Sequence, residues 1–179
     1  LYHTVAETGA ATRQYEVASK LSYFLWGSMP DAPLLALAAQ GKLDDPATIE
    51  AQVRRLLADQ RSGDFVKSFT LQWLSIEKMK TVSINKELFP RFLYVHKGGE
   101  TAGREIPNRP TIRDYMEDET VGFIAELIKT NASVTNLVDS QFAFINQPLA
   151  AHYGVAGVQG IELRTVSIKP EHHLGGLLT

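Results

Sequence analysis

The sequence contains no cysteine. Within this chain, that absence excludes disulfides, thiolate metal sites, a cysteine nucleophile and the C-x-x-C-H attachment of c-type haem. It leaves the cellular compartment open, because proteins of oxidising and of reducing compartments can both lack cysteine.

The chain also lacks an excess of positive charge and a long apolar run. It has 18 Lys and Arg against 20 Asp and Glu, for a net charge of −2. A dedicated nucleic-acid-binding domain usually carries a basic face, so that class is disfavoured. No apolar run approaches the roughly 20 residues that span a bilayer. No signal peptide is visible. The chain begins at Leu1 and ends in an apolar run, and we interpret it as a piece of a longer polypeptide.

What the chain does have is one stretch, residues 15–31, that is unusually rich in apolar and aromatic side chains. Apolar residues recur there at three- and four-residue spacing, which predicts a helix over residues 14–26. Gly27 and Pro30 end it. Its aromatic content predicts a central core helix that is buried on most sides.

Cap signals divide the next part of the chain into further helices. Asp31 followed by Pro33, and Asp45 followed by Pro46, each predict an N-cap with proline in the first turn. Gly41 suits the end of the second helix, and Ser62 opens a fourth. Short connections between them predict antiparallel neighbours in a bundle.

The second half is less regular. Residues 80–110 are rich in glycine, proline and charge, which predicts a long central surface loop. A long helix follows to about Asn131, and Asn146 caps a short helix over residues 147–153. Residues 142–145 read as an extended piece and residues 161–168 as a strand without an obvious partner. The predicted fold class is therefore mainly α: an irregular antiparallel helical bundle with a long central loop and, as an open alternative, a short C-terminal strand.

Few residues are candidates for catalysis or for metal binding. The acidic run Asp114, Glu117, Asp118 and Glu119 allows a cation site, but a solvated helix face explains it better. For the adjacent pair His172 and His173 the alternatives are a metal or axial haem ligand and no ligand role, and the absence of a nearby third ligand favours the second. We therefore predict no metal site and no catalytic set in this chain. His152, Asn146 and Tyr153, on and beside one short helix, form the candidate polar site.

Several segments together resemble a known family. They are YEVASKLSYFLWGSMPDAPLLALAAQGKL, EAQVRRLLAD, FVKSFTLQWL, FINQPLAAHYGV and HHLGGLLT. They resemble large uncharacterised proteins, abundant in planctomycetes, in which several domains of unknown function follow a c-type cytochrome module. The likeness covers residues 15–74 and 139–179. Residues 91–110 depart from the family pattern and look like an insertion.

The resemblance implies an exported, extracytoplasmic bacterial protein with haem c in a neighbouring domain. It implies no cofactor in this chain and no assigned catalytic residue. It also implies a division of the chain: residues 1–13 end a preceding domain or lead in, residues 14–160 form the helical bundle, and residues 161–179 start a following domain or form an extension.

Three functions remain open at this stage. The first is a structural or docking module without catalysis, whose partners are neighbouring domains of the same polypeptide. The second is part of a redox or hydrolytic enzyme, with its site at a junction to a neighbouring domain near Asn146, His152 and the loop of residues 91–110. The third is a carbohydrate- or polymer-binding module that uses exposed Tyr94, Tyr115 and Tyr153. The small-molecule or polymer ligand is not identified by any of them.

Overall fold

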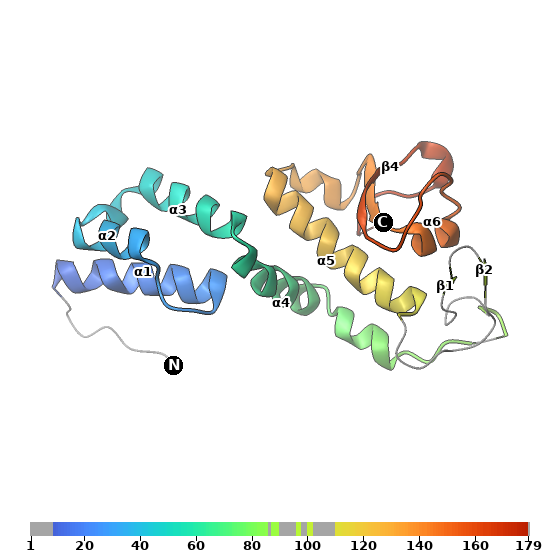
Figure 1. Cartoon of the computed structure of the whole chain (residues 1–179), viewed down its shortest axis with the longest axis horizontal. Coiled ribbons are helices and arrows are strands. Elements are labelled where there is room, and N and C mark those ends of the chain that lie inside the picture. Colours follow the sequence, from blue (N-terminus) through green and yellow to red (C-terminus); the bar gives the residue numbers. More distant parts are fainter. Residues whose placement is uncertain (1–8, 86, 90–95, 98–99, 102–109, 179) are drawn as a thin grey trace. The chain divides into compact units, whose positions relative to one another are not determined.

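The structure is a computed structural model that describes residues 9–85, 87–89, 96–97, 100–101 and 110–178. The chain divides into two compact units, here called the N-terminal unit (residues 1–67) and the C-terminal unit (residues 68–179). Each is described by itself (Figure 1). The described residues are mostly helical with a small antiparallel sheet near the C-terminal end, which confirms the predicted fold class.

The N-terminal unit is built from short helices whose ends follow the predicted cap signals. Asp31 accepts a hydrogen bond from the Leu34 amide at 3.1 Å, and Asp45 accepts one from the Thr48 amide at 3.0 Å. Gly27 ends the first helix in the left-handed region, at a φ of 64°, where a side chain would be strained. The elements are α1 (Ala10–Trp26), α2 (Ala32–Ala39), η1 (Lys42–Asp44), α3 (Pro46–Ala58) and η2 (Gln60–Ser62), and α4 (Gly63–Trp73) spans the division between the units.

Two long-range hydrogen bonds show how α1 lies against its neighbours. Near the start of α1, Gln14 accepts from the Leu43 amide at 2.8 Å, just before α3 begins. At the end of α1, the Trp26 indole donates to the carbonyl of Leu56, near the end of α3, at 2.9 Å. Helices α1 and α3 therefore run in the same direction, while α2 turns back along α1 (Figure 1).

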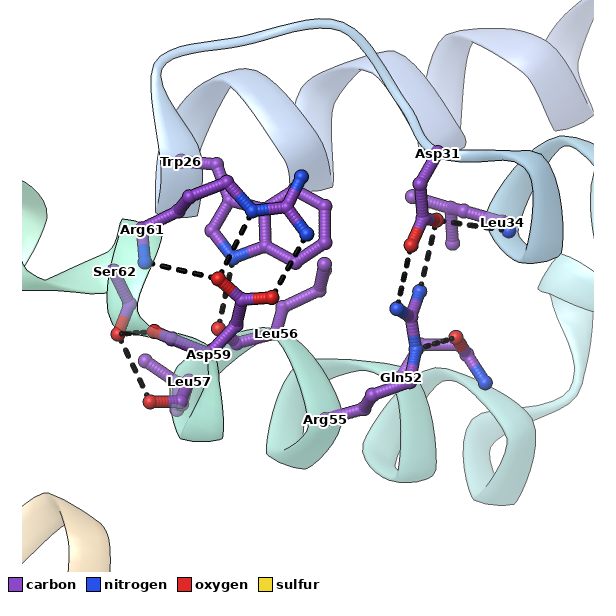
Figure 2. A network of polar contacts seen from close by, with 10 residues as sticks. All are labelled: Trp26, Asp31, Leu34, Gln52, Arg55, Leu56, Leu57, Asp59, Arg61 and Ser62. Atoms are coloured by element: carbon purple, nitrogen blue, oxygen red, sulfur yellow. Dashed lines mark hydrogen bonds and ion pairs between the residues drawn. The ribbon is translucent and has the colours of Figure 1, made fainter.

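Trp26 is the centre of a polar network that closes this unit (Figure 2). The Arg61 guanidinium lies 3.4 Å from the centre of its ring, a cation–π contact, and is itself held by Asp59 at 2.8 Å. Arg55 forms a two-pronged ion pair with Asp31, at 2.7 and 3.0 Å. The arginine lowers the pKa of Asp31 below its usual range. These contacts join the start of α2 to the end of α3.

The prediction that α1 is buried on most sides is wrong. Its buried side chains, among them Gln14, Ala18 and Leu25, share one face, and that face alone meets α2, η1 and α3. Phe24 is 66% exposed although its ring contacts that of Phe65, with centroids 4.8 Å apart. The short helices of this unit cover too little of α1 to enclose a second face.

The C-terminal unit is organised around its longest helix, α5 (Ile112–Thr130). Thr111 and Asp114 form a reciprocal capping box at its start, in which the Asp114 carboxylate accepts from the Thr111 amide at 2.8 Å. The other elements are η3 (Ile76–Thr81), η4 (Val134–Leu137), β3 (Phe142–Ile145), α6 (Gln147–Tyr153), β4 (Arg164–Ser167) and η5 (Pro170–His172).

Strand β4 finds its partner in β3, which it pairs antiparallel from Phe142 opposite Ser167 to Ile145 opposite Arg164. This confirms the short C-terminal strand. A core cluster packs under the pair and under α6, with Ile145 and Leu149 fully buried. Residues 161–178 thus lie in the same unit as α5 and α6, and the boundaries at 13/14 and 160/161 stay predictions about the parent polypeptide.

The predicted long loop is only partly within the described residues. Its start is η3, a 3₁₀ helix that continues to Thr81. Later in the loop, β1 (His96–Lys97) and β2 (Glu100–Thr101) pair as a small antiparallel hairpin. The remainder, including most of residues 91–110 and Tyr94, lies outside the described residues.

Candidate functional site

A cavity of about 530 Å³ opens in the C-terminal unit, between α5, α6, β3, η3 and the segment after η5. Its volume falls in the range of small-molecule sites, roughly 300–1,000 Å³. Most of its wall is apolar, from Met79, Met116, Phe123, Phe142, Leu174 and Leu177. A few polar side chains interrupt that wall: Glu119, Thr120, Tyr153 and His173. Apolar walls with a few convergent polar groups are typical of ligand sites.

Glu119 and Tyr153 form the principal polar contact of the cavity. The Tyr153 hydroxyl donates to Glu119 Oε2 at 2.6 Å, a short, charge-assisted length when the carboxyl is ionised. Glu119 is in the middle of α5 and Tyr153 is the last residue of α6, so the bond joins the two helices. Both side chains are half-buried.

Burial shifts the protonation of both groups. Removal from water disfavours the carboxylate and raises the pKa of Glu119 from 4.5 to about 7, although the Tyr153 hydrogen bond acts in the opposite direction. Burial, with Glu119 as second cause, raises the pKa of Tyr153. Among the described residues, no Lys, Arg or His contributes to the shift in the pKa of Glu119. A carboxyl group that titrates near neutral pH can accept or release a proton on a bound molecule, as a general acid or base does.

The wall formed by residues 173–177 is held by the backbone. The Gly176 amide donates to the carbonyl of Val138 at 3.1 Å, and the Leu178 amide donates to that of Leu137 at 2.9 Å. A Cβ on Gly176 would clash with the backbone of Leu137 and Asn136. Glycine is therefore required there for the segment to lie against η4 and form its part of the cavity wall.

Of the three residues of the predicted polar site, His152, Asn146 and Tyr153, only Tyr153 lines the cavity. Asn146 is fully buried and serves the fold: its Oδ1 accepts from the Leu149 amide at 3.1 Å, which caps α6. Its Nδ2 donates to the carbonyl of Ile161 at 3.0 Å, which ties the β4 side of the unit to α6. Both polar atoms of the Asn146 side chain therefore bond to backbone groups.

Replacing Asn146 by alanine is expected to lower the free energy of unfolding by about 2 kcal/mol. The helix cap contributes about 1 kcal/mol, and the loss of the part-buried hydrogen bond to the Ile161 carbonyl adds about 1 kcal/mol. Asn136→Ala is the control, since its side chain donates to the Ser133 carbonyl in an exposed position, at 2.8 Å. Urea unfolding followed by circular dichroism measures both variants. Equal small losses would contradict the structural role of Asn146.

The three candidate histidines differ in their surroundings. His152 is on an exposed part of α6, with its ring centre 5.5 Å from that of Tyr153, and it does not line the cavity. Partial shielding from water lowers its pKa. His172 accepts a hydrogen bond from the Lys169 amide at 3.1 Å through Nδ1. His173, in the left-handed region at a φ of 51°, lines the cavity instead.

The interpretation of the acidic run as a solvated helix face is wrong for Glu117 and Glu119. Asp114 belongs to the capping box of α5. Glu117 is buried and pairs with Lys80 at 2.8 Å, which joins η3 to α5. Glu119 lines the cavity, and Asp118 is exposed.

The position of Glu119 in the helical repeat of α5 is the sequence signal that could have identified it as a cavity residue. It lies three residues after Met116 and four before Phe123, on the face that the core residues Ile112 and Leu127 also occupy. A carboxylate in register with an apolar stripe is buried unless the stripe ends there. Because its neighbours are also acidic, Glu119 was assigned with them to the solvated face.

Metal binding has no support in the described ranges. Among these residues no group of three or more His, Asp or Glu side chains is arranged to hold a metal ion. Nor, within the same residues, is any helix long and apolar enough to cross a membrane.

Of the three tyrosines predicted for sugar binding, the two that the structure describes, Tyr115 and Tyr153, do not form an exposed aromatic surface. Tyr115 is half-buried and packs against the core cluster under the β3–β4 pair. Tyr153 is half-buried with its hydroxyl bound to Glu119. An exposed aromatic platform needs open ring faces, and these two rings are used for packing.

Replacing Tyr153 by phenylalanine is expected to raise the pKa of Glu119 above 7. The hydroxyl stabilises the ionised carboxyl, so its loss leaves burial unopposed. The ¹³C carboxyl shift of Glu119, followed by NMR as a function of pH, measures this. Tyr23→Phe, at an exposed position on α1, is the matched control and should leave the curve in place. A Glu119 titration that moves downward in Tyr153→Phe would contradict the assignment of the bond.

Fold and cavity together define a class: a mainly helical domain whose C-terminal unit contains a small-molecule-sized cavity with a carboxyl–phenol pair in its wall. Residues 12–155 match the family PSD4, described as a protein of unknown function (DUF1592). The match covers most of the chain, and the chain belongs to this family. No curated protein and no solved structure matches it.

Proposed function

We propose that this domain binds a small, largely apolar molecule in the cavity of the C-terminal unit. The observation that carries the proposal is the Glu119–Tyr153 pair in the wall of that cavity. A half-buried carboxyl group in an apolar wall costs stability. A bound molecule that forms a hydrogen bond with this carboxyl group compensates for that cost.

The test uses three six-carbon probes that differ in their head group: hexan-1-ol, hexylammonium and hexanoate. Each is titrated into the ¹⁵N-labelled chain, and the amide shifts of Thr120 and Leu174 report on the cavity. At least one probe is expected to bind with a Kd on the order of 1 mM or tighter, given the usual free energy per ligand atom.

A cavity-filling variant makes the test specific. Met79 is half-buried and lines the cavity, so Met79→Trp should remove binding. Met29→Trp is the matched control, because Met29 is 72% exposed in the N-terminal unit. If no probe shifts the cavity amides, or if Met79→Trp binds as well as the wild type, the proposal fails.

A second candidate keeps the hypothesis from the sequence: a structural or docking module of a larger extracytoplasmic protein, beside a domain that carries haem c. The exposure of Tyr23 and Phe24 on α1, 55% and 66%, favours it, because aromatic side chains are enriched in interfaces. Both belong to the stretch of residues 15–31 that carries the family resemblance. The partner in this hypothesis is a neighbouring domain of the same polypeptide.

Its test mixes this chain with the separately purified haem-carrying domain of the parent polypeptide. Sedimentation should show a complex that the double variant Tyr23→Ser, Phe24→Ser weakens at least tenfold. Leu35→Ser, at a position 38% exposed on α2, is the control. The absence of a haem spectrum in the parent protein, or of any complex, would refute this candidate.

A further inference from the structure

We propose that the ligand of the cavity is an organic ammonium ion with an apolar body, seated with its charge beside Glu119. The inference rests on the proposed function of the same cavity and names its ligand class. It stands on the geometry of three features: a carboxyl whose described partner is a neutral hydroxyl, the aromatic rings in the same cavity wall and the apolar remainder of that wall.

The first feature is the missing counter-charge. Within the part of the chain that the structure describes, Glu119 forms no ion pair, and its hydrogen-bond partner is the neutral Tyr153 hydroxyl. Buried carboxylates in proteins are usually paired with a cation. An ammonium group in the cavity would supply that partner, whereas a carboxylate ligand would add a second negative charge.

The second feature is the set of rings in the wall. Phe123 and Phe142 stack with centroids 4.9 Å apart, and Tyr153 lies at the polar end of the same cavity. Aromatic rings attract cations through their quadrupole, and aromatic-lined sites recognise organic ammonium ligands. Met79 and Met116 complete the wall with thioether side chains that adapt to irregular alkyl groups.

None of the other described titratable groups near Glu119 acts as its counter-charge. Lys80, from η3, is engaged with Glu117 at 2.8 Å, on a neighbouring part of α5. From α6, His152 lies outside the lining of the cavity. His173, from the segment after η5, lines the cavity but does not contribute to the shifted pKa of Glu119. Ammonium binding should therefore depend on the ionisation of Glu119 itself.

The six-carbon probes separate this inference from the proposed function. Hexylammonium is expected to bind at least tenfold more tightly than hexan-1-ol at pH 8, and hexanoate least tightly. Because Glu119 titrates near pH 7, hexylammonium affinity should rise about tenfold from pH 6 to pH 8, while hexan-1-ol affinity stays level. Glu119→Gln should remove the preference for hexylammonium over hexan-1-ol.

The outcomes are distinct. If hexan-1-ol binds in the cavity as tightly as hexylammonium, or if Glu119→Gln keeps the preference, the ammonium inference is wrong while the cavity remains a ligand site. Hexylammonium binding that survives Met79→Trp also overturns the inference, because it then occurs elsewhere. If none of the three probes binds, the proposed function fails with it.

Discussion

At pH 8 the Glu119→Gln variant is expected to be about 2 kcal/mol more stable than the wild-type protein, and at pH 4 the two are expected to be equally stable. The folded state raises the pKa of Glu119 from 4.5 to about 7 by burial. Between these values the folded protein binds more protons than the unfolded chain, so stability falls as pH rises through this window and is level above it. The full shift corresponds to about 3 kcal/mol, which partial exposure of the half-buried side chain reduces.

Glutamine reproduces the neutral carboxyl group and can still accept from the Tyr153 hydroxyl, so the variant removes the charge and little else. Urea unfolding at half-unit steps from pH 4 to pH 9 measures the profile. Glu126→Gln, half-buried on the same helix, is the matched control and should follow the wild-type curve. Parallel profiles for wild type and Glu119→Gln would show that Glu119 is not the group that burial perturbs.

Replacing Trp26 by alanine is expected to destabilise the N-terminal unit by about 3–5 kcal/mol, the usual cost of truncating a buried tryptophan. The side chain is 8% exposed and packs among Leu25, Leu34 and Leu56. Its indole N–H also bonds the Leu56 carbonyl, at 2.9 Å. Truncation therefore leaves a cavity and a buried carbonyl without its partner, and it removes the surface on which Arg61 lies.

Tyr23→Ala is the matched control, because Tyr23 is on the same helix but 55% exposed, and its loss should cost less than about 1 kcal/mol. Guanidinium unfolding followed by circular dichroism measures both. Trp26→Phe separates the two contributions: it keeps much of the packing and loses the hydrogen bond. Equal losses for Trp26→Ala and Tyr23→Ala would contradict the assignment of Trp26 as the closing residue of this core.

If both predictions hold, stability and ligand chemistry belong to different parts of the chain. The family-typical stretch of residues 15–31 contributes a core around Trp26, whose contacts are structural. The protonatable group lies in the C-terminal unit, in the cavity beside α5 and α6. Functional comparisons within the family should therefore begin from Glu119 and Tyr153.

Local signals were sufficient where one residue decides a helix end. Asp31, Asp45 and Asn146 were predicted as N-caps and are N-caps, because the hydrogen bond involved reaches only three residues along the chain. Gly27 and Gly154 likewise end their helices in the left-handed region. The same locality explains why Asn146, singled out as a polar site, is a cap: its signal was structural.

The candidate site needed contacts that sequence spacing does not contain. Tyr153 was named as a candidate, but its partner Glu119 is 34 residues away along the chain and was placed on the solvated face. The register of Glu119 with Met116 and Phe123 was readable. The sequence did not show which part of the protein would pack against this face of α5. That depends on β3, α6 and the segment after η5, which fold back onto α5.

The sequence by itself determined the helical class, most helix ends and the two extended pieces, residues 142–145 and, within the predicted 161–168, residues 164–167, since these depend on interactions within a few residues. Only the tertiary structure decided that the two extended pieces pair with each other and that Glu119 faces an apolar cavity. It also decided that Phe24 stays exposed while Trp26 is enclosed. The reason is the same in each case: burial depends on what packs against a residue, and that partner comes from a distant part of the chain.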